Sequence, residues 1–377
     1  MKTRRSFAWS IALIAVVSLV ASACGSSDSD TSTGSGGSNP TTQTTKAADK
    51  DQLADLSAKL DGAGSSFQDT FEQQVASDFA KEVSDAGGSA TVSYTKTGSS
   101  DGKKSLADKT VDFAGSDSPI KDEEKASFGD STVLYFPIVG GPIAMAYKLE
   151  GVEDLKLSAD NIAKIFQGQI TSWDDPAIAE DNPDAELPAT KITVVHRSDG
   201  SGTTSNFTKF LKAASGEWKL DAGETVNWPQ SSNFQGAEKS TGVTQVVSTT
   251  NGAITYADLA DAAKAELAVA EVGNAEGKFI APTPDNASKA LGAAEINDDL
   301  TYDPLNADAK GAYPITSPTW ILAYQDQADQ AKAETLKAYL RYVLTTGQAS
   351  AKDLLYAPLP EELASKAVDQ IDQIKAG

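Results

Sequence analysis

The segment from Arg197 to Thr203 reads R-S-D-G-S-G-T and brings together residue types that bind a small oxyanion. Its two glycines allow the backbone to come close to a ligand. Arg197 offers a planar fork of N–H donors, which Asp199 is well placed to orient, and Ser201 and Thr203 add hydroxyl donors. A helix predicted to begin here would add unpaired N–H groups and the positive end of its dipole. This combination predicts an oxyanion site.

A second interpretation of the same segment is a turn followed by a capped helix, because Asp-Gly-Ser-Gly is ordinary turn chemistry. The residues of the segment alone leave both interpretations open. The sequence lacks the lysine-bearing phosphate loop of nucleotide hydrolases, which argues against nucleotide binding. Its single histidine, His196, and single cysteine, Cys24, exclude a multi-histidine metal site and an intrachain disulfide. We therefore expect no metal and no cofactor.

The charge of the chain restricts its partners. The 377 residues include 32 Lys and Arg against 53 Asp and Glu, for a net charge of −21. Nucleic acid and anionic membrane surfaces favour a basic face, so neither is expected as a partner. A small anion held by directed hydrogen bonds is compatible with this charge. The chain is also long enough for two lobes with separate cores.

The first 23 residues have the order of an export signal. A short basic start precedes an apolar run over residues 11–20, and small residues then lead to Cys24. The segment resembles a bacterial lipoprotein signal, in which this cysteine becomes the acylated first residue, although Ala21 stands where that family prefers Leu. Residues 24–52 are rich in Ser, Thr and Gly and predict a flexible linker. We expect an exported protein tethered by lipid to the outer face of the cell membrane.

From residue 53 onward the sequence alternates between strand and helix patterns. Apolar residues recur every fourth position over 67–83 and stop before Gly87, which is typical of an amphipathic helix, entered here through Ser65 or Ser66. Such alternation predicts an α/β fold with sheets covered by helices on both faces. Further predicted strands cover residues 91–94, 111–114, 132–137, 143–147 and 192–195. Further helices are predicted after Ser158 and over residues 201–211, 327–345 and 360–374. Residues 253–265 are predicted to form a strand followed by a helix.

Several unusual motifs occur in a fixed order over nearly the whole chain after the linker. They are G-A-G-S-S-F (62–67), T-G-S-S (97–100), V-D-F-A-G-S-D-S-P (111–119), I-F-Q-G-Q-I-T-S-W-D-D-P-A-I (165–178), V-V-H-R-S-D-G-S-G-T-T-S-N-F-T-K-F-L (194–211) and Y-P-I-T-S (313–317). In this order they resemble the high-affinity phosphate-binding proteins of bacterial phosphate ABC importers.

The resemblance implies a two-lobed periplasmic-binding-protein fold of type II. Each lobe would be a mixed sheet flanked by helices, with phosphate in the cleft between the lobes. Residues 53–138 and 315–377 would form one lobe and residues 139–314 the other. Hinge closure would bury phosphate, and the closed protein would dock on the transmembrane permease subunits of the importer. A separate subunit would hydrolyse ATP, so the chain itself is not expected to be an enzyme.

The resemblance also implies a set of ligand residues. Three departures from the family pattern are Ser66 for Thr, Gln68 for Pro and Asp101 for Gly, and the last adds negative charge near the site if it points inward. Phe67 would contribute its backbone N–H, and Asp199 would orient Arg197. The implied phosphate-binding residues are Ser66, Phe67, Ser99 and Asp117 from one lobe and Arg197, Ser201, Gly202 and Thr203 from the other.

The role implied for Asp117 would explain selectivity. At neutral pH phosphate keeps at least one proton and sulfate has none. A buried carboxylate accepts a hydrogen bond from a P–OH group but repels a fully ionised oxyanion, and an unpaired acceptor in a dry site costs about 1–3 kcal/mol. Asp117 therefore predicts discrimination against sulfate. The alternative is an aspartate that only caps the turn before Pro119.

Three other functions compete with phosphate transport. A secreted phosphatase or serine hydrolase could use Ser201 as its nucleophile, but His196 is the one imidazole base available, and strand alternation should turn it away from the side of Arg197. The same fold could bind sulfate, molybdate or an organophosphate. A lipoprotein that kept the fold for signalling or adhesion is the third.

Overall fold

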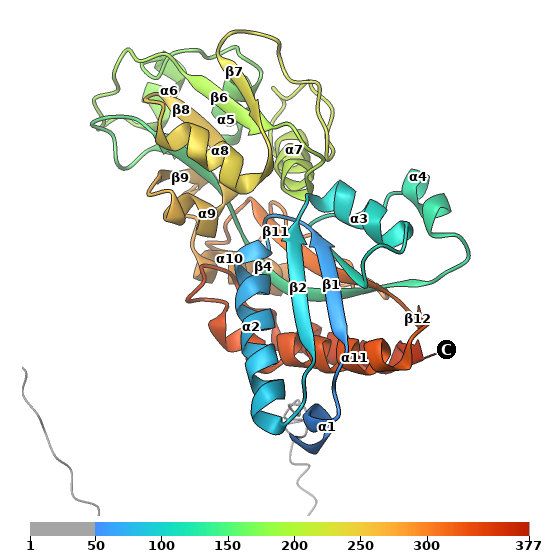
Figure 1. The fold of residues 1–377 in the computed structure, drawn as a ribbon. Coiled ribbons are helices and arrows are strands. Elements are labelled where there is room, and N and C mark those ends of the chain that lie inside the picture. Colours follow the sequence, from blue (N-terminus) through green and yellow to red (C-terminus); the bar gives the residue numbers. More distant parts are fainter. Residues whose placement is uncertain (1–49, 377) are drawn as a thin grey trace, which may run out of the picture. The chain divides into compact units, whose positions relative to one another are not determined.

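The computed structural model describes residues 50–376 (Figure 1). The predicted signal, the acylation site at Cys24 and nearly all of the linker lie outside the described residues. Between residues 50 and 376, no helix combines the length and the apolar character that a membrane crossing requires.

The centre of the described chain is a mixed sheet with the strand order β2-β1-β3-β11-β4-β8-β6-β7, in which β9 also pairs with β4, β5 and β10. The strands are β1 (Lys59–Gly64), β2 (Thr91–Lys96), β3 (Phe113–Ser116), β4 (Val133–Lys148), β5 (Lys156–Leu157), β6 (Thr193–Arg197), β7 (Phe234–Ala237), β8 (Ala253–Asp258), β9 (Ala268–Gly273), β10 (Phe279–Ile280), β11 (Thr316–Tyr324), and the separate pair β12 (Asp326–Gln327) and β13 (Lys375–Ala376).

Strand β4 joins the two halves of this sheet. Its residues 133–142 pair with β11, and its residues 143–148 pair with β8. We call the half that contains β1, β2, β3 and β11 lobe I, and the half that contains β6, β7, β8 and β9 lobe II. The two-lobed α/β architecture expected from the sequence is thus present, with one long strand common to both lobes.

The prediction of two separate strands at 132–137 and 143–147 is wrong, because β4 is continuous through Gly140 and Gly141. Glycine is present at these two positions because neighbouring side chains pack closely against the extended strand, and not because the chain turns there. A Cβ atom at Gly140 would lie 2.7 Å from a methyl carbon of Leu291, and one at Gly141 would lie 3.2 Å from the ring of Phe67.

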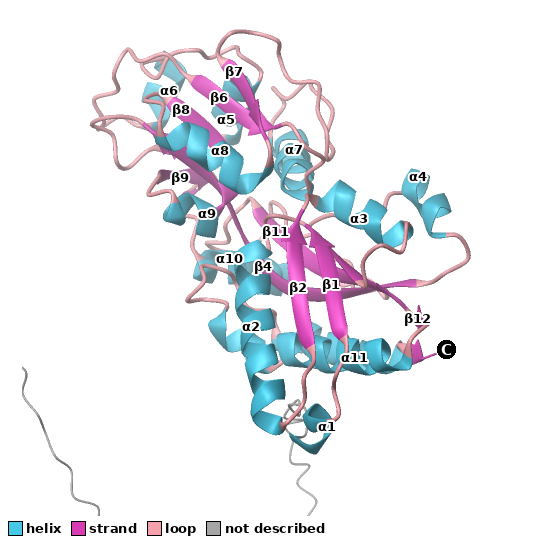
Figure 2. Cartoon of the chain, in the orientation of Figure 1, coloured by secondary structure: helices cyan, strands magenta, loops and turns pink. Residues whose placement is uncertain are grey.

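Helices cover the sheet in both lobes (Figure 2). In lobe I, α2 packs against β2, α3 packs against β1 and β3, and α11 packs against α2 and β1. In lobe II, α8 packs against β6 and β8, and α7 packs against β8 and α5. The α-helices are α1 (Lys50–Ala54), α2 (Asp69–Ala86), α3 (Ser99–Ala107), α4 (Asp122–Lys125), α5 (Ala159–Phe166), α6 (Pro176–Asp181), α7 (Gly202–Ala214), α8 (Lys239–Ser248), α9 (Leu259–Lys264), α10 (Pro284–Ala293), α11 (Gln330–Leu344) and α12 (Glu361–Gln370).

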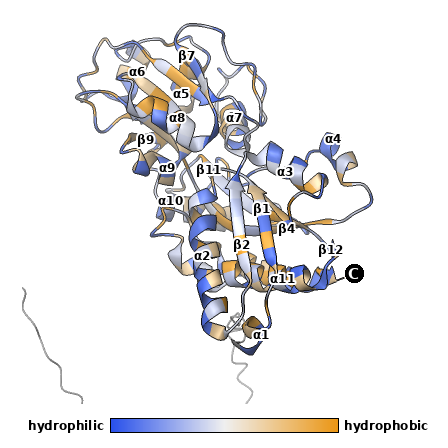
Figure 3. Cartoon of the chain, in the orientation of Figure 1, coloured by the Kyte–Doolittle hydropathy of each residue, from blue (hydrophilic) through white to orange (hydrophobic). Residues whose placement is uncertain are grey.

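Helix α2 follows the predicted four-residue pattern. Phe71, Val75, Phe79 and Val83 are all fully buried, while the outer side of the helix is mainly hydrophilic (Figure 3). The helix ends at Gly87, whose φ of 100° satisfies the left-handed C-cap as predicted.

The predicted start of α2 is wrong. The N-cap residue is Gln68, without a side-chain cap bond, rather than Ser65 or Ser66. The reason is that both serines have other partners. The Ser65 hydroxyl donates to Asp117, and the Ser66 hydroxyl contacts Ser240 of lobe II. These serines face the junction between the lobes instead of capping a helix.

Other elements agree with the predictions in kind and shift at their ends. Ser158 caps α5 by accepting from the N–H of Asn161 at 3.4 Å. The predicted helix over 360–374 is α12 followed by a short 3-10 turn over Ile371–Gln373. Strands β1 and β11 were not predicted, although both are central to lobe I.

Candidate anion-binding site

The R-S-D-G-S-G-T segment connects β6 to α7 as predicted. Ser201 is the N-cap residue of α7, and its Oγ accepts from the N–H of Thr204 at 3.1 Å. Capping and anion binding are therefore not alternatives here. The N–H groups of Gly202 and Thr203 lie in the first helical turn, where helix geometry provides no acceptor. The positive end of a 13-residue helix is located at this point.

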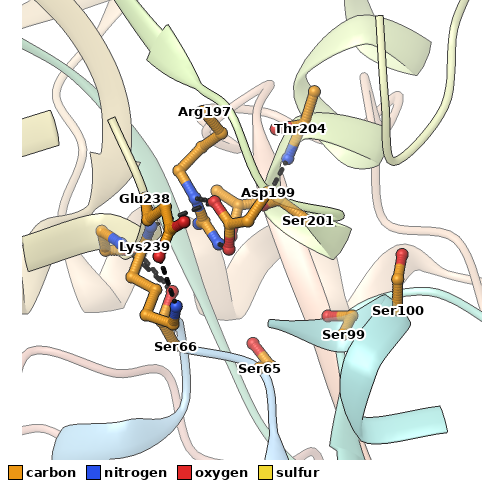
Figure 4. A network of polar contacts seen from close by, with 12 residues as sticks. Ser65, Ser66, Ser99, Ser100, Arg197, Asp199, Ser201, Thr204, Glu238 and Lys239 are labelled. Atoms are coloured by element: carbon orange, nitrogen blue, oxygen red, sulfur yellow. Dashed lines mark hydrogen bonds and ion pairs between the residues drawn. The ribbon is translucent and has the colours of Figure 1, made fainter. Parts of the chain in front are cut away.

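Arg197 is held rigidly beside this helix terminus. Its guanidinium donates from Nε and Nη2 to the two oxygens of Asp199, at 2.6 and 2.5 Å (Figure 4). Asp199 also accepts from the N–H of Lys239, the first residue of α8, at 3.0 Å. Burial acts to raise the pKa of Asp199, but the Arg197 fork outweighs it and the pKa is lowered. The predicted orienting contact between Asp199 and Arg197 is present.

The third nitrogen of Arg197 has no partner within the described part of the chain. Nη1 is buried without a hydrogen-bond acceptor, and the side chain of Arg197 is only 2% exposed. A buried guanidinium with an unused donor is a costly arrangement unless a ligand or a water molecule provides the acceptor. Nη1 of Arg197 is therefore available to donate to either.

Asp117 follows β3 in lobe I and is 1% exposed. Its Oδ1 accepts from the hydroxyl of Ser65, and its Oδ2 accepts from the hydroxyl of Thr203 in lobe II at 3.1 Å. Its N–H donates to Oγ of Ser99 at 3.4 Å. Burial raises the pKa of Asp117 to about 6, against the lowering effect of the hydroxyl donors and of Arg197. The site thus contains a carboxylate that takes up a proton more readily than usual.

The lobes are in close contact around this carboxylate. A Cβ atom at Gly202 would lie 2.6 Å from Oγ of Ser99 and 2.8 Å from Cβ of Asp117, so glycine alone fits there without displacement. Beside it, the N–H of Ser100 donates to the carbonyl of Gly200 at 3.3 Å. Ser99, Asp117, Gly202 and Thr203, all predicted as ligand residues, are thus brought together from both lobes.

Ser66 and Phe67 lie at a different part of the junction. Oγ of Ser66 is 3.1 Å from Oγ of Ser240 and accepts from the N–H of Ser240 at 3.2 Å. The N–H of Phe67, predicted to face the ligand, donates to Oγ of Ser65 at 3.0 Å. Figure 4 shows Ser65 and Ser66 on the lobe I side, across from Arg197 and Asp199.

Three polar residues that were not predicted as ligand residues also lie at the junction between the lobes. Ser65 lies in the same motif as Ser66 and could have been found there. Asn206 follows Thr203 by three residues, a spacing that places both on one face of α7, and its amide donates to the carbonyl of Asp117 at 2.7 Å. Ser240 has no comparable signal, because its contact is with a residue 174 positions away.

His196 does not form a catalytic pair with Ser201. Its ring stacks on Trp228 with 5.1 Å between ring centroids, and its Nδ1 lies 3.1 Å from its neighbour's carbonyl, that of Arg197. Burial lowers the pKa of His196. Across residues 50–376, no group of three or more His, Cys, Asp or Glu side chains is arranged to hold a metal ion.

Comparison with known proteins identifies the class and then the family. Residues 35–346 match the model of the PBP superfamily domain. Two solved structures share the fold. A high-affinity periplasmic phosphate-binding protein bound with phosphate has a TM-score of 0.70 at 21% identity, covering 83% of this chain and 94% of that one. A phosphate-binding protein from Stenotrophomonas maltophilia has a TM-score of 0.63 at 21% identity, covering 83% and 93%. The chain is a two-lobed protein of the PBP superfamily.

Sequence relatives define the family more narrowly. The phosphate-binding protein PstS of Xylella fastidiosa is 34% identical over 318 residues, which cover 82% of this chain and 84% of the relative. The phosphate-binding protein PstS 3 of Mycobacterium tuberculosis is 35% identical over 295 residues, which cover 75% and 79%. The chain belongs to the family of PstS phosphate-binding proteins.

Proposed function

We propose that the chain is the inorganic-phosphate receptor of an ABC-type importer. It would capture phosphate between its lobes and deliver it to the transmembrane permease. The observation that carries the proposal is the pairing of two buried groups of opposite character. Arg197 has an unused donor on the lobe II side, and Asp117 is a carboxylate of raised pKa on the lobe I side. The PstS family membership supports the same ligand.

The residues divide between general anion binding and recognition of a protonated anion. Arg197 and the first-turn N–H groups of Gly202 and Thr203 would hold any oxyanion. Asp117 would accept from a P–OH group, a hydrogen bond that sulfate cannot donate. Ser99 and the hydroxyl of Thr203 contact Asp117 and would complete the site, and Ser201 keeps α7 in position by capping it. Ser66 and Phe67 would join the site through small movements of their present contacts.

Titration calorimetry with phosphate and sulfate tests the proposal on the chain from residue 24 onward, with Cys24→Ser to avoid acylation. We expect phosphate to bind much more tightly than sulfate. Asp117→Asn should narrow the ratio of the two dissociation constants by roughly 10- to 100-fold, because it removes the negative charge that repels sulfate and replaces one acceptor oxygen with an NH2 donor. Tight sulfate binding by the unmodified site, or no phosphate binding, would rule out the proposed ligand. An unchanged ratio in the Asp117 variant would remove that residue from its role.

We also propose that the chain is a receptor without hydrolase activity. In support, the ring of His196 stacks on Trp228, and Oγ of Ser201 is occupied as a helix cap. Turnover of a phosphate ester that survives repurification and is lost in Ser201→Ala would overturn this proposal.

The lobe boundaries and the location are proposals of the same kind. Residues 53–138 with 315–377 and residues 139–314 would move as two bodies. In support, β4 exchanges β11 for β8 after residue 142, four residues beyond the first boundary, although α10 of the second body packs against β11. We propose an exported protein, anchored through lipid on Cys24. Incorporation of labelled palmitate that persists in Cys24→Ser would contradict the anchor.

A further inference from the structure

Glu224 is a lobe II residue whose side chain lies among residues of lobe I. It belongs to the loop between α7 and β7, and its side chain is 2% exposed. Its carboxylate lies 2.7 Å from Nζ of Lys103 and accepts from the hydroxyl of Ser100 at 2.8 Å and from the hydroxyl of Ser118. Lys121 adds a more distant ion pair at 3.4 Å. Four lobe I side chains therefore converge on one lobe II carboxylate.

These partners adjoin the lobe I residues of the proposed phosphate site. Ser99 begins α3, Ser100 follows it directly and Lys103 lies one turn further on, and Ser118 is the residue after Asp117. On its own side, the carbonyl of Glu224 accepts from the N–H of Ser201 at 3.0 Å. Glu224 thus touches the immediate neighbours of phosphate-site residues in lobe I and holds a phosphate-site residue of lobe II through its backbone.

The charges around Glu224 favour its ionised form. Burial acts to raise the pKa of Glu224, but the charge and hydrogen bond of Lys103 outweigh it, with further help from Ser118 and Ser100, and the pKa is lowered. Lys103 is itself only 2% exposed and also pairs with Glu124 of lobe I at 2.7 Å. Separation of the lobes would leave Lys103 paired with Glu124 and would remove every side-chain partner of Glu224 described above. The Glu224 contacts would therefore form only when the lobes are together.

We propose that Glu224 is a positioning residue for phosphate binding, which fastens α3 and the Asp117 segment to the Ser201 loop and so slows the release of phosphate. The inference rests on the proposed phosphate-binding function. Release requires the lobes to part, and parting breaks one buried ion pair and two hydrogen bonds to a charged group at Glu224. Capture precedes closure, so the rate constant of association should depend little on this residue.

Stopped-flow measurement of phosphate association and release tests the inference on the chain from residue 24 with Cys24→Ser. We expect Glu224→Gln to raise the dissociation rate constant about tenfold or more and to change the association rate constant less than about twofold. The midpoint of thermal unfolding without phosphate should stay close to that of the parent. Glu180→Gln, at an exposed position of α6, is the matched control and should leave both rate constants unchanged.

A double-mutant cycle with Lys103→Gln assigns the effect to the ion pair. The two substitutions together should raise the dissociation rate constant by much less than the product of their separate effects. Ser100→Ala removes one donor to Glu224 and provides a milder second test, with a several-fold rise expected. An unchanged dissociation rate constant in both Glu224→Gln and Ser100→Ala would overturn the inference while phosphate binding itself remained. Failure of the parent chain to bind phosphate would instead overturn the proposed function.

Discussion

At the scale of single residues, Asp117 and Glu72 are both buried carboxylates of raised pKa, and their surroundings differ. Asp117 lies between the lobes and has Arg197 nearby as a compensating charge. Glu72 of α2 is fully buried inside lobe I, and its hydrogen-bond donors, the side chains of Gln68 and Tyr339, are neutral. The first arrangement suits a ligand that carries a proton. The second affects stability, because a carboxylate without a nearby cation is expensive to ionise in a protein interior.

Because the pKa of Glu72 is raised in the folded state, we expect the stability of the protein to depend on pH. Burial raises the pKa of Glu72 from 4.5 to about 7, so the folded state binds this proton more tightly than the unfolded state. Its contribution to stability is full below about pH 4.5 and is lost as the pH rises to about 7. Glu72→Gln should remove this pH dependence. The change in the free energy of unfolding that the substitution causes should be more favourable at pH 8 than at pH 4.5 by on the order of 3 kcal/mol. Urea unfolding of both proteins at the two pH values measures the difference. Parallel pH profiles would contradict the prediction.

At the scale of elements, the site depends on how closely the start of α7 approaches lobe I. The helix brings Gly202 and Thr203 against Ser99 and Asp117, and the absence of a side chain at Gly202 allows the approach. Strand β4 connects the two sheets because it is paired in both. The anion site is thus formed by a helix terminus of one lobe on a strand end of the other.

Gly202→Ala tests this contact between elements. The new methyl group would meet Ser99 and Asp117, both of lobe I, so it should oppose closure of the lobes more than folding of either lobe. We expect the phosphate dissociation constant to rise about 10- to 100-fold, from an overpacking cost of about 1–3 kcal/mol. Calorimetry measures the constant, and thermal unfolding without phosphate should change little. Gly216→Ala at an open position is the control, and an equal loss of affinity there would remove the steric explanation.

At the scale of the whole molecule, the lobes are held together by polar contacts around the site. Ser66 with Ser240, Thr203 with Asp117, and Glu224 with Lys103 all link one lobe to the other. Polar contacts of this kind are readily exchanged for contacts with water when the lobes separate. A receptor that must open to release its ligand benefits from such a junction, and bound phosphate would add further favourable contacts to the closed form.

Phosphate should therefore stabilise the folded protein through mass action. At a free phosphate concentration 100 times the dissociation constant, the free energy of unfolding should increase by about 2.7 kcal/mol. Urea unfolding followed by tryptophan fluorescence measures the increase, with sulfate at the same ionic strength as the control. An equal increase with sulfate would show that the stabilisation comes from salt or from unselective anion binding.

Features that depend on neighbours a few positions apart could be predicted from the sequence. The four-residue apolar pattern identified α2, Gly87 marked its end, and the R-S-D-G-S-G-T segment was correctly placed between a strand and a helix. The ordered motifs identified the family. These signals are readable because helix periodicity, capping and turn formation are decided by contacts within one or two turns of chain.

The tertiary structure decided the features that depend on contacts between distant segments. The continuity of β4 follows from its partners β11 and β8, which outweigh the turn signal of its glycines. The hydroxyl of Ser65 does not cap a helix as expected but donates to Asp117, 52 positions away. The hydroxyl of Ser118 donates to Glu224, 106 positions away. Such pairings have no local signature, because the free energy that selects them comes from burial and hydrogen bonding after the chain has folded back on itself.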